Sequence, residues 1–179
     1  SIAMAYAIWE GFIQTAFSNY LEELSKKGKH ILEFKEQFLV FDIENRFKQL
    51  FEYPKNSSKK AEFFGKLKEY FDKESHELYS PIDTESNVGF DVLNKIMLSF
   101  CLDKFPEHWK TYRGPEPSLK VMLKRFLDYR NAIAHGQDIT SQEKVTQQVY
   151  AKFRGLVLDL MYEIQDRMLK ALEEESYLK

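Results

Sequence analysis

Apolar side chains recur at spacings of three and four along most of the chain, which is the pattern of helices that each bury one face. No stretch shows the alternation of apolar and polar residues that a half-buried β-strand requires. We therefore predict an all-α fold, a helical bundle with long N- and C-terminal helices. The predicted helices cover residues 2–26, 32–51, 58–73, 91–102, 119–135 and a last helix that starts at 140.

Residues at the ends of these helices support the predicted boundaries. Gly28 follows the first helix, and Ser118 is a good N-cap for the fifth helix, which Gly136 ends. Thr140 and Glu143 form a capping box at the start of the last helix. The tail EEESYLK is polar enough to fray. Two stretches are predicted to be irregular, residues 74–89 and 106–117.

Length and composition fit a single globular domain, residues 1–179. Hydrophobic residues make up 44% of the chain and charged residues 30%, and seven glycines with five prolines argue against disorder and against a glycine-punctuated all-β fold. The net charge of −2 and the pI near 6.1 provide no global basic field, which argues against a protein that lives on duplex DNA. These values still allow a local basic groove.

The cysteine content predicts the compartment. Cys101 is the one cysteine and cannot form an internal disulfide, so we expect a reducing compartment and a cytoplasmic protein. Because it lies in the apolar run IMLSFCL, we interpret it as a small buried side chain rather than a nucleophile. The opening stretch SIAMAYAIWEGFI is apolar, but Glu10 interrupts it and no basic segment precedes it. We therefore expect neither a signal peptide nor a membrane-spanning helix.

Residues 127–136, LDYRNAIAHG, place polar side chains at the end of a helix that already has an apolar face. Arg130 falls in a stripe where an apolar residue would fit, whereas Asn131 and His135 share a polar stripe because they are four residues apart. The carbonyl groups at the helix end favour a protonated His135, and the permanently charged Arg130 suits a phosphate oxygen. Two interpretations fit this spacing: an active site, or charges that only complement the helix dipole.

The string YRNAIAHG, at the end of the penultimate long helix and before a capped last helix, resembles the signature of the HEPN superfamily. That signature is an arginine and a histidine separated by four to six residues, commonly with a polar residue directly after the arginine. The matching residues in this chain are Arg130, Asn131 and His135. The stretches FIQTAFSNYLEEL and SNVGFDVLNKIMLSFCLD are also similar to an uncharacterised bacterial branch, the MAE-type group. Only the Arg-to-His motif is specific.

The resemblance implies a metal-independent endoribonuclease that uses no cofactor and forms a homodimer, with both motifs lining one composite cleft. His135 would be the general acid or base, Arg130 would hold the scissile phosphate, and Asn131 would orient the histidine or contact phosphate. The RNA 2′-hydroxyl would attack its neighbouring phosphate and leave a 2′,3′-cyclic phosphate and a 5′-hydroxyl. Lys124 and Arg125 on the motif helix are the candidates for a local RNA groove.

Members of this superfamily serve in bacterial defence, toxin–antitoxin and stress systems, so an antitoxin or a regulatory protein is an expected partner. Some toxin members carry a tyrosine two residues after the histidine, where this chain has Gln137, so a modification that relies on that tyrosine is not expected. Two alternatives stay open. One is a non-catalytic HEPN module that binds a nucleotide, RNA or partner protein, or acts as a scaffold. The other is a helical oligomerisation module in which Arg130 and His135 are only caps.

Several further side chains have both a functional and a structural interpretation. Glu10 is either a second acidic member of the site or a residue that faces solvent or pairs with a base. Trp109, Tyr112 and Arg113 either stack on a base or hold the proline-rich loop against the bundle.

The remaining polar runs suggest no separate chemistry. None of the spacings typical of a zinc or di-metal site occurs among His30, His76 and His108, so no metal is expected. We interpret the KNSSKK run at residues 55–60 as a solvated turn. The paired aromatics Phe63 and Phe64 are interpreted as core or dimer surface.

Overall fold

The computed structural model describes residues 1–110, 112, 117–136 and 146–179. Over these residues the chain is helical, and its β pairing is limited to two isolated bridges, Phe34 with Leu178 and Trp109 with Tyr112. The predicted all-α fold is confirmed. The elements are α1 (Ile2–Ser25), η1 (Ile31–Glu33), α2 (Glu36–Arg46), η2 (Lys48–Leu50), α3 (Ser57–Phe71), α4 (Phe90–Ser99), α5 (Leu119–Ala134) and α6 (Gln147–Glu173).

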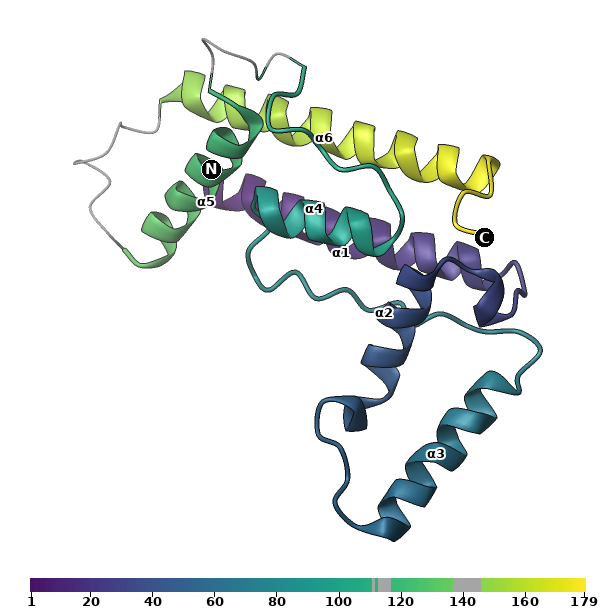
Figure 1. The fold of residues 1–179 in the computed structure, drawn as a ribbon. Helices are drawn as coiled ribbons and strands as arrows, with labels where there is room; N and C mark the ends of the chain where they lie inside the picture. The colour runs from purple at the N-terminus through teal and green to yellow at the C-terminus, as the bar shows by residue number, and fades with distance from the viewer. Residues whose placement is uncertain (111, 113–116, 137–145) are drawn as a thin grey trace.

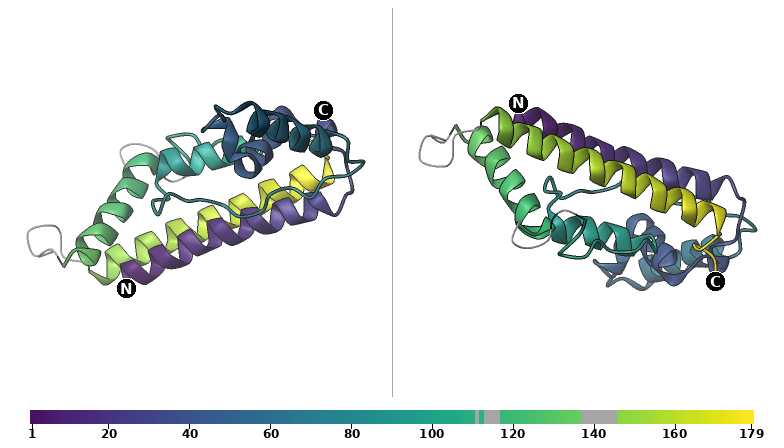
Figure 2. Two further views of the ribbon diagram at one scale, coloured as in Figure 1. Left: turned by 90° about the horizontal axis from the view of Figure 1, so that it is seen from below. Right: turned by 90° about the horizontal axis from the view of Figure 1, so that it is seen from above.

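The long helices α1 and α6 lie side by side and run in the same direction along the molecule (Figure 1, Figure 2). Helix α5 packs on α1, and its C-terminal end lies at the same end of the molecule as the starts of α1 and α6 (Figure 2). Helices α2 and α3 project away from this bundle (Figure 1). We call residues 36–71, which contain α2 and α3, the arm.

The core forms where the predicted apolar faces of α1, α5 and α6 meet. The predicted core face of α6 from Phe153 to Met168 is buried. The same holds for every α1 residue at the three- and four-residue spacing, namely Ile2, Tyr6, Trp9, Ile13, Phe17, Tyr20 and Leu24. At the end that carries the motif, Phe126 of α5 stacks on Phe153 with ring centroids 5.0 Å apart and meets the edge of Tyr6 at 5.4 Å. Within the described ranges, none of these helices is long and apolar enough to cross a membrane.

The expected helix over residues 32–51 is wrong as a single element. It is interrupted at Phe34, which has the extended angles φ −72° and ψ 157°, and again at Phe47. The reason is tertiary, because Phe34 is fully buried and packs against Tyr177 at 6.0 Å. The backbone N–H of Lys35 donates to the Tyr177 carbonyl at 2.9 Å, so the tail EEESYLK is packed rather than frayed.

The last helix also begins later than predicted. Helix α6 starts at Gln147, where the Thr146 hydroxyl accepts a hydrogen bond from the Val149 N–H at 3.2 Å. The predicted capping residues Thr140 and Glu143 lie outside the described residues.

The irregular segment predicted over residues 74–89 is confirmed, and it runs along α1. Trp9 Nε1 donates to the Val88 carbonyl at 3.0 Å, and the Val88 N–H donates to the Tyr6 hydroxyl at 2.7 Å. Further along α1, the Ser18 hydroxyl donates to the Ser80 carbonyl at 2.7 Å. These bonds satisfy backbone groups that lack helical partners and fix the segment against the bundle.

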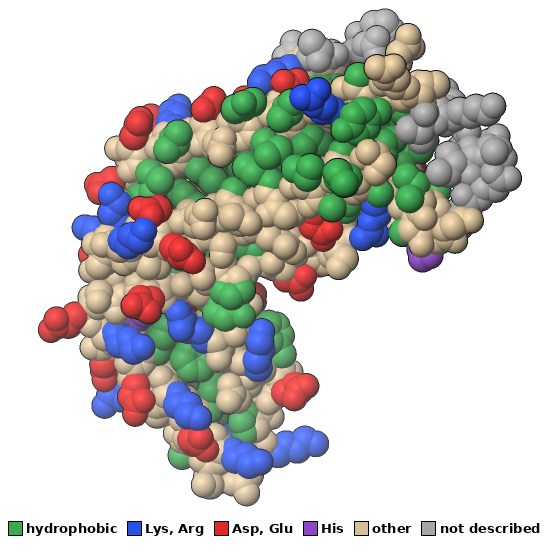
Figure 3. All heavy atoms as spheres, turned by 180° about the vertical axis from the view of Figure 1, so that it is seen from behind, with side chains coloured by type: hydrophobic (Ala, Val, Ile, Leu, Met, Phe, Trp, Pro, Cys, Tyr) green, Lys and Arg blue, Asp and Glu red, His purple; other side chains and the backbone are tan. Residues whose placement is uncertain are grey.

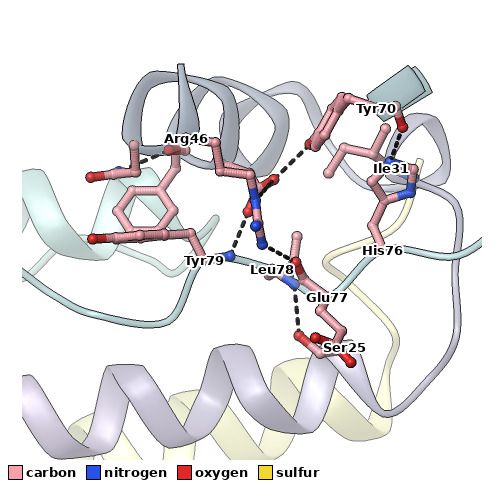
Figure 4. Close-up of polar contacts among 11 residues, drawn as sticks. Ser25, Ile31, Arg46, Tyr70, His76, Glu77, Leu78 and Tyr79 are labelled. Carbon is pink, nitrogen blue, oxygen red and sulfur yellow. Dashed lines mark hydrogen bonds and ion pairs between the residues drawn. The ribbon is translucent and has the colours of Figure 1, made fainter. Parts of the chain in front are cut away.

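A buried polar cluster joins the arm to the bundle (Figure 4). The Asp42 carboxylate is inaccessible to solvent and accepts hydrogen bonds from Tyr70 Oη at 2.7 Å, from Arg46 Nε at 2.8 Å and from the Tyr79 N–H. His76 Nδ1 accepts from the Ile31 N–H at 3.2 Å. Its Nε2 lies 2.7 Å from the Tyr70 carbonyl, which can only accept, so His76 is neutral with the proton on Nε2. We call these residues the arm joint.

Candidate functional site

The motif residues are positioned by the C-terminal end of α5. The Ser118 hydroxyl accepts a hydrogen bond from the Val121 N–H at 3.3 Å, which confirms Ser118 as the N-cap. The helix ends at Ala134 with His135 as its C-cap, and Gly136 follows in the left-handed conformation at φ +61°. Glycine is favoured there because it has no Cβ to clash. The predicted end of the fifth helix is therefore confirmed.

Arg130 is half-buried and its side chain is held from two sides. Its Cζ lies 5.1 Å from the centroid of the Tyr6 ring, and its Nη1 donates to Asn131 Oδ1 at 2.9 Å. A guanidinium over an aromatic face is attracted by the negative face of the ring. This contact explains how a charged residue fits into an otherwise apolar stripe. The stripe itself was predicted, but nothing in the sequence identified Tyr6 as the partner of Arg130.

Tyr6 is a neutral phenol in this setting. Burial raises the pKa of its hydroxyl, and nearby Glu10 raises it further, whereas the Val88 N–H and the Arg130 charge lower it. Because the net direction is upward, the ring presents an uncharged face to Arg130 near neutral pH.

His135 differs from Arg130 in that its side chain is exposed. Its backbone N–H donates to the Asn131 carbonyl at 3.0 Å, which fixes the position of its Cα at the helix end. The imidazole can therefore meet a ligand from solvent without displacing core side chains. The predicted role of Asn131 in orienting His135 stays a prediction, since its side-chain oxygen accepts a hydrogen bond from Arg130.

The candidate RNA-binding cations lie on the solvent side of α5. Lys124 and Arg125 are both exposed, and Lys124 pairs with Asp128 at 2.7 Å. Ten residues separate Arg125 from His135, which corresponds to about 15 Å along a helix. Lys120, another exposed cation of α5, lies beside Phe90 of α4 with its Nζ 5.9 Å from the ring centroid and 4.0 Å from an Asp91 carboxylate oxygen. The exposed cations of α5 therefore lie in the N-terminal half of the helix, and Lys120 and Lys124 each face an acidic side chain.

The structure decides one of the alternative interpretations of other residues and leaves another open. Glu10 is half-buried and accepts a hydrogen bond from the Thr84 hydroxyl at 2.8 Å, which ties the irregular segment to α1 but matches neither of its two interpretations. Trp109 and Tyr112 are buried and stack at 6.2 Å, so they hold their loop against the bundle, as one interpretation expected. Arg113 lies outside the described residues.

Two of the scattered histidines lie away from the motif, because His76 belongs to the arm joint and His30 packs on it. His30 and His76 meet edge to face with ring centroids 5.1 Å apart. Across the part of the chain that the structure describes, histidine, cysteine and acidic side chains form no group of three that could hold a metal ion.

A comparison with protein-family models matches residues 1–170 to the RiboL-PSP-HEPN model. The chain belongs to the RiboL-PSP-HEPN family. This confirms the predicted membership of the HEPN superfamily, while the resemblance to the MAE-type branch stays a prediction. The single-domain assignment to residues 1–179 also stays a prediction. Comparisons with curated proteins and with solved structures gave no match.

Proposed function

We propose that this RiboL-PSP-HEPN protein is a metal-independent endoribonuclease that acts through Arg130, Asn131 and His135. The observation that carries the proposal is the placement of the motif, with Arg130 anchored on Tyr6 and His135 exposed at the very end of α5. An anchored cation and a solvent-facing imidazole near the end of one helix are the two kinds of side chain that phosphate-directed acid–base chemistry needs.

In the proposed reaction the RNA 2′-oxygen forms a bond to its neighbouring phosphorus, and the bond from phosphorus to the 5′-oxygen breaks. A base accepts the 2′-hydroxyl proton, and an acid gives a proton to the departing 5′-oxygen. The products are a 2′,3′-cyclic phosphate and a 5′-hydroxyl. Arg130 stabilises the charge that develops on the phosphoryl oxygens. One imidazole cannot be protonated and unprotonated at once, so two copies of His135 would supply both the acid and the base.

An exposed apolar surface near the motif supports the homodimer. Figure 3 shows hydrophobic side chains gathered along the side of the molecule formed by α1 and α6. Large apolar patches on a protein surface mark contact sites. On α1 the patch begins at Met4 and Ile8, in the same turns of the helix as Tyr6 but on its outer side, so a partner bound there would cover the end of the bundle that carries the motif. We call this patch the α1–α6 apolar face; its most exposed members are Met4, Ile8, Leu158, Tyr162 and Leu169.

The proposed function is tested by cleavage of a labelled, unstructured RNA in excess EDTA. Wild type, Arg130→Ala and His135→Ala are compared after identical purification, with dimer state checked by size-exclusion chromatography. His108→Ala is the matched control, because His108 is an exposed histidine in a loop. We expect wild type and His108→Ala to yield cyclic-phosphate ends, and both motif variants to be at least about a hundredfold slower. Equal cleavage by all four proteins would indicate a contaminating nuclease.

One observation favours a second function, a HEPN module that binds RNA, a nucleotide or a partner protein without turnover. The Arg130 guanidinium is already engaged by Asn131 and Tyr6, so its charge also serves the fold. If all proteins are folded, dimeric and silent on several RNAs, this function replaces the first. An antitoxin or regulatory partner, a cytoplasmic location and a role in bacterial defence or stress belong to the same proposal, as does RNA contact by Lys124 and Arg125.

A further inference from the structure

The outer part of the arm, residues 48–68, differs in charge from the rest of the molecule. It contains six lysines and two glutamates, a net charge of +4, within a chain whose net charge is −2. Among described residues, the one ion pair that these lysines make is Lys66 with Glu62 at 2.6 Å. The other four acidic residues of the arm, Glu36, Asp42, Glu44 and Glu69, lie in its remaining parts, residues 36–47 and 69–71. Positive charge is therefore concentrated where the arm extends furthest from the bundle (Figure 1).

Aromatic side chains are exposed on the same part of the arm. Phe51 is 66% exposed, Tyr53 50% and Phe64 54%. The rings of Tyr53 and Phe64 each contact buried Phe63, with centroids 6.3 Å and 5.4 Å apart, and leave about half of their surface to solvent. The ammonium group of Lys60 lies 5.2 Å from the centroid of the Tyr53 ring. Figure 3 shows hydrophobic side chains among the lysines of this projecting part.

The rings and the lysines alternate along one line. Lys60, Phe64 and Lys68 follow each other at four-residue spacing, which places them on one face of α3 about 6 Å apart along the axis. Tyr53 continues this line through its contact with Lys60. We call Tyr53, Lys60, Phe64 and Lys68 the arm stripe. A repeating order of ring and cation matches a polymer that repeats a flat base and a phosphate.

We propose that the arm stripe is a second RNA-binding surface, which holds single-stranded RNA away from the motif. Bases stack on exposed rings whatever their sequence, and phosphates are attracted to the lysines between them. This inference rests on the proposed function only in taking RNA as the ligand. It requires neither cleavage nor the α1–α6 apolar face.

A membrane surface is the other polyanion that lysines and aromatics suit, but the position of the rings disfavours it. A helix that lies in a membrane interface keeps its apolar side chains on one face and its charged side chains on the opposite face. On α3, Phe64 shares a face with Lys60 and Lys68 because these residues follow each other at four-residue spacing. Rings and cations are therefore mixed on one face of the arm, which suits a nucleic acid better than a bilayer.

The arm and the motif lie toward opposite ends of the bundle (Figure 2). Helix α1, which runs between these ends, has 24 residues and is therefore about 36 Å long. A very short RNA cannot reach from the arm to the motif. Long substrates would therefore gain affinity from the arm, whereas short ones that occupy the motif would not.

The test measures RNA binding without cleavage, by fluorescence anisotropy of a labelled oligouridine of about 30 nucleotides on His135→Ala protein that comprises residues 1–179. In this background Phe64→Ala is compared with Leu98→Ala, a half-exposed apolar residue of α4. Lys60→Ala/Lys68→Ala is compared with Lys27→Ala/Lys104→Ala, which removes the same charge elsewhere on the surface. Circular dichroism and thermal melting confirm that each variant is folded. The same proteins are also tested on vesicles that contain phosphatidylserine.

We expect Phe64→Ala to raise the Kd for the long RNA at least about fivefold, since one stacked base is lost. The double lysine variant should also lower the slope of log K against log salt by about 1.4, because each phosphate contact on a single strand contributes about 0.7. Both controls should leave Kd within about twofold of the parent, apart from a uniform charge effect on the lysine pair.

Equal RNA affinity of arm and control variants overturns the arm proposal, as does an absence of RNA binding by the parent. If the protein binds anionic vesicles through the arm and does not bind RNA, the ligand of the arm is a membrane instead of RNA. None of these outcomes is evidence for or against the proposed function, which the separate cleavage assay in EDTA tests. If cleavage fails while RNA binding through the arm holds, the ribonuclease proposal is lost and the arm proposal stands.

Discussion

Removal of the Asp42 side chain tests whether the arm joint fixes the arm. Asp42 is the single acceptor for Tyr70 Oη, Arg46 Nε and the Tyr79 N–H, and it has no exposed surface. Asp42→Ala leaves the tyrosine hydroxyl and the backbone N–H without an acceptor and Arg46 without its ion pair. Each such loss costs about 1–3 kcal/mol when the group is buried. Because Arg46 is partly exposed and regains water, we expect a total of about 3–5 kcal/mol.

The assay is urea unfolding followed by circular dichroism, with the free energy of unfolding extrapolated to water. A loss of that size is a large share of the roughly 5–15 kcal/mol that stabilises a domain. Glu44→Ala is the matched control, since it removes an exposed carboxylate from the same helix and should change stability by less than about 0.5 kcal/mol. Tyr70→Phe removes one of the three donors and should cost about 1 kcal/mol.

The double variant Asp42→Ala/Tyr70→Phe separates a shared network from independent contacts. Without the Tyr70 hydroxyl, the loss of Asp42 leaves one hydrogen-bond donor fewer without an acceptor. The double variant should therefore cost less than the sum of the two single variants, with a coupling of about 1 kcal/mol. Strict additivity, or a cost below about 1 kcal/mol for Asp42→Ala alone, would refute the idea that the joint is one network centred on Asp42.

Three further predictions concern pH, assembly and the anchor of the motif. Burial lowers the pKa of His76 in the folded protein. The stability that neutral His76 contributes is therefore complete above the ordinary histidine pKa of about 6.5 and is lost as the pH falls toward the folded-state pKa. The melting temperature should drop between pH 7.5 and 5.5, and it should drop less in His76→Gln. If the proposed dimer forms through the α1–α6 apolar face, Ile8→Glu should give a monomer by analytical ultracentrifugation and abolish cleavage, whereas Leu98→Glu should do neither. Tyr6→Leu should slow cleavage about fivefold by removing the ring under Arg130, while Tyr6→Phe, which keeps the ring, should retain the wild-type rate despite a lower melting temperature.

Local sequence patterns were sufficient to predict the helices that bury one long apolar face. The periodicity of α1 and α6 predicted their core residues, and Ser118 and Gly136 predicted both ends of α5. The same rules failed between residues 32 and 51. There the chain is broken so that Phe34 can pack on Tyr177, which lies 143 positions further along the sequence. A pattern confined to neighbouring residues carries no information about such a contact.

The candidate site, like the fold, could be predicted from the sequence only in part. The spacing of Arg130, Asn131 and His135 predicted which residues share the helix end, but the stacking of Arg130 on Tyr6 depends on how α1 and α5 cross. The arm joint could not be predicted either, since Asp42 and His76 are far apart in sequence and each resembles an ordinary surface residue. The aromatic pair Phe63 and Phe64 divides between core and surface, because Phe63 is 4% exposed and Phe64 is 54% exposed.

The motif spacing left two interpretations open, and the structure shows how to test them, because Arg130 and His135 are held differently. Arg130 is built into the packing of α5 on α1, so its replacement should cost both stability and any activity. The His135 side chain is exposed, and its link to the helix is a backbone hydrogen bond that alanine would also make. If His135 only complemented the helix dipole, His135→Ala would cost about 0.5–2 kcal/mol and change nothing else. If it is the acid or base, the same substitution should leave the melting temperature nearly unchanged and abolish cleavage, so measuring both on one variant decides between them.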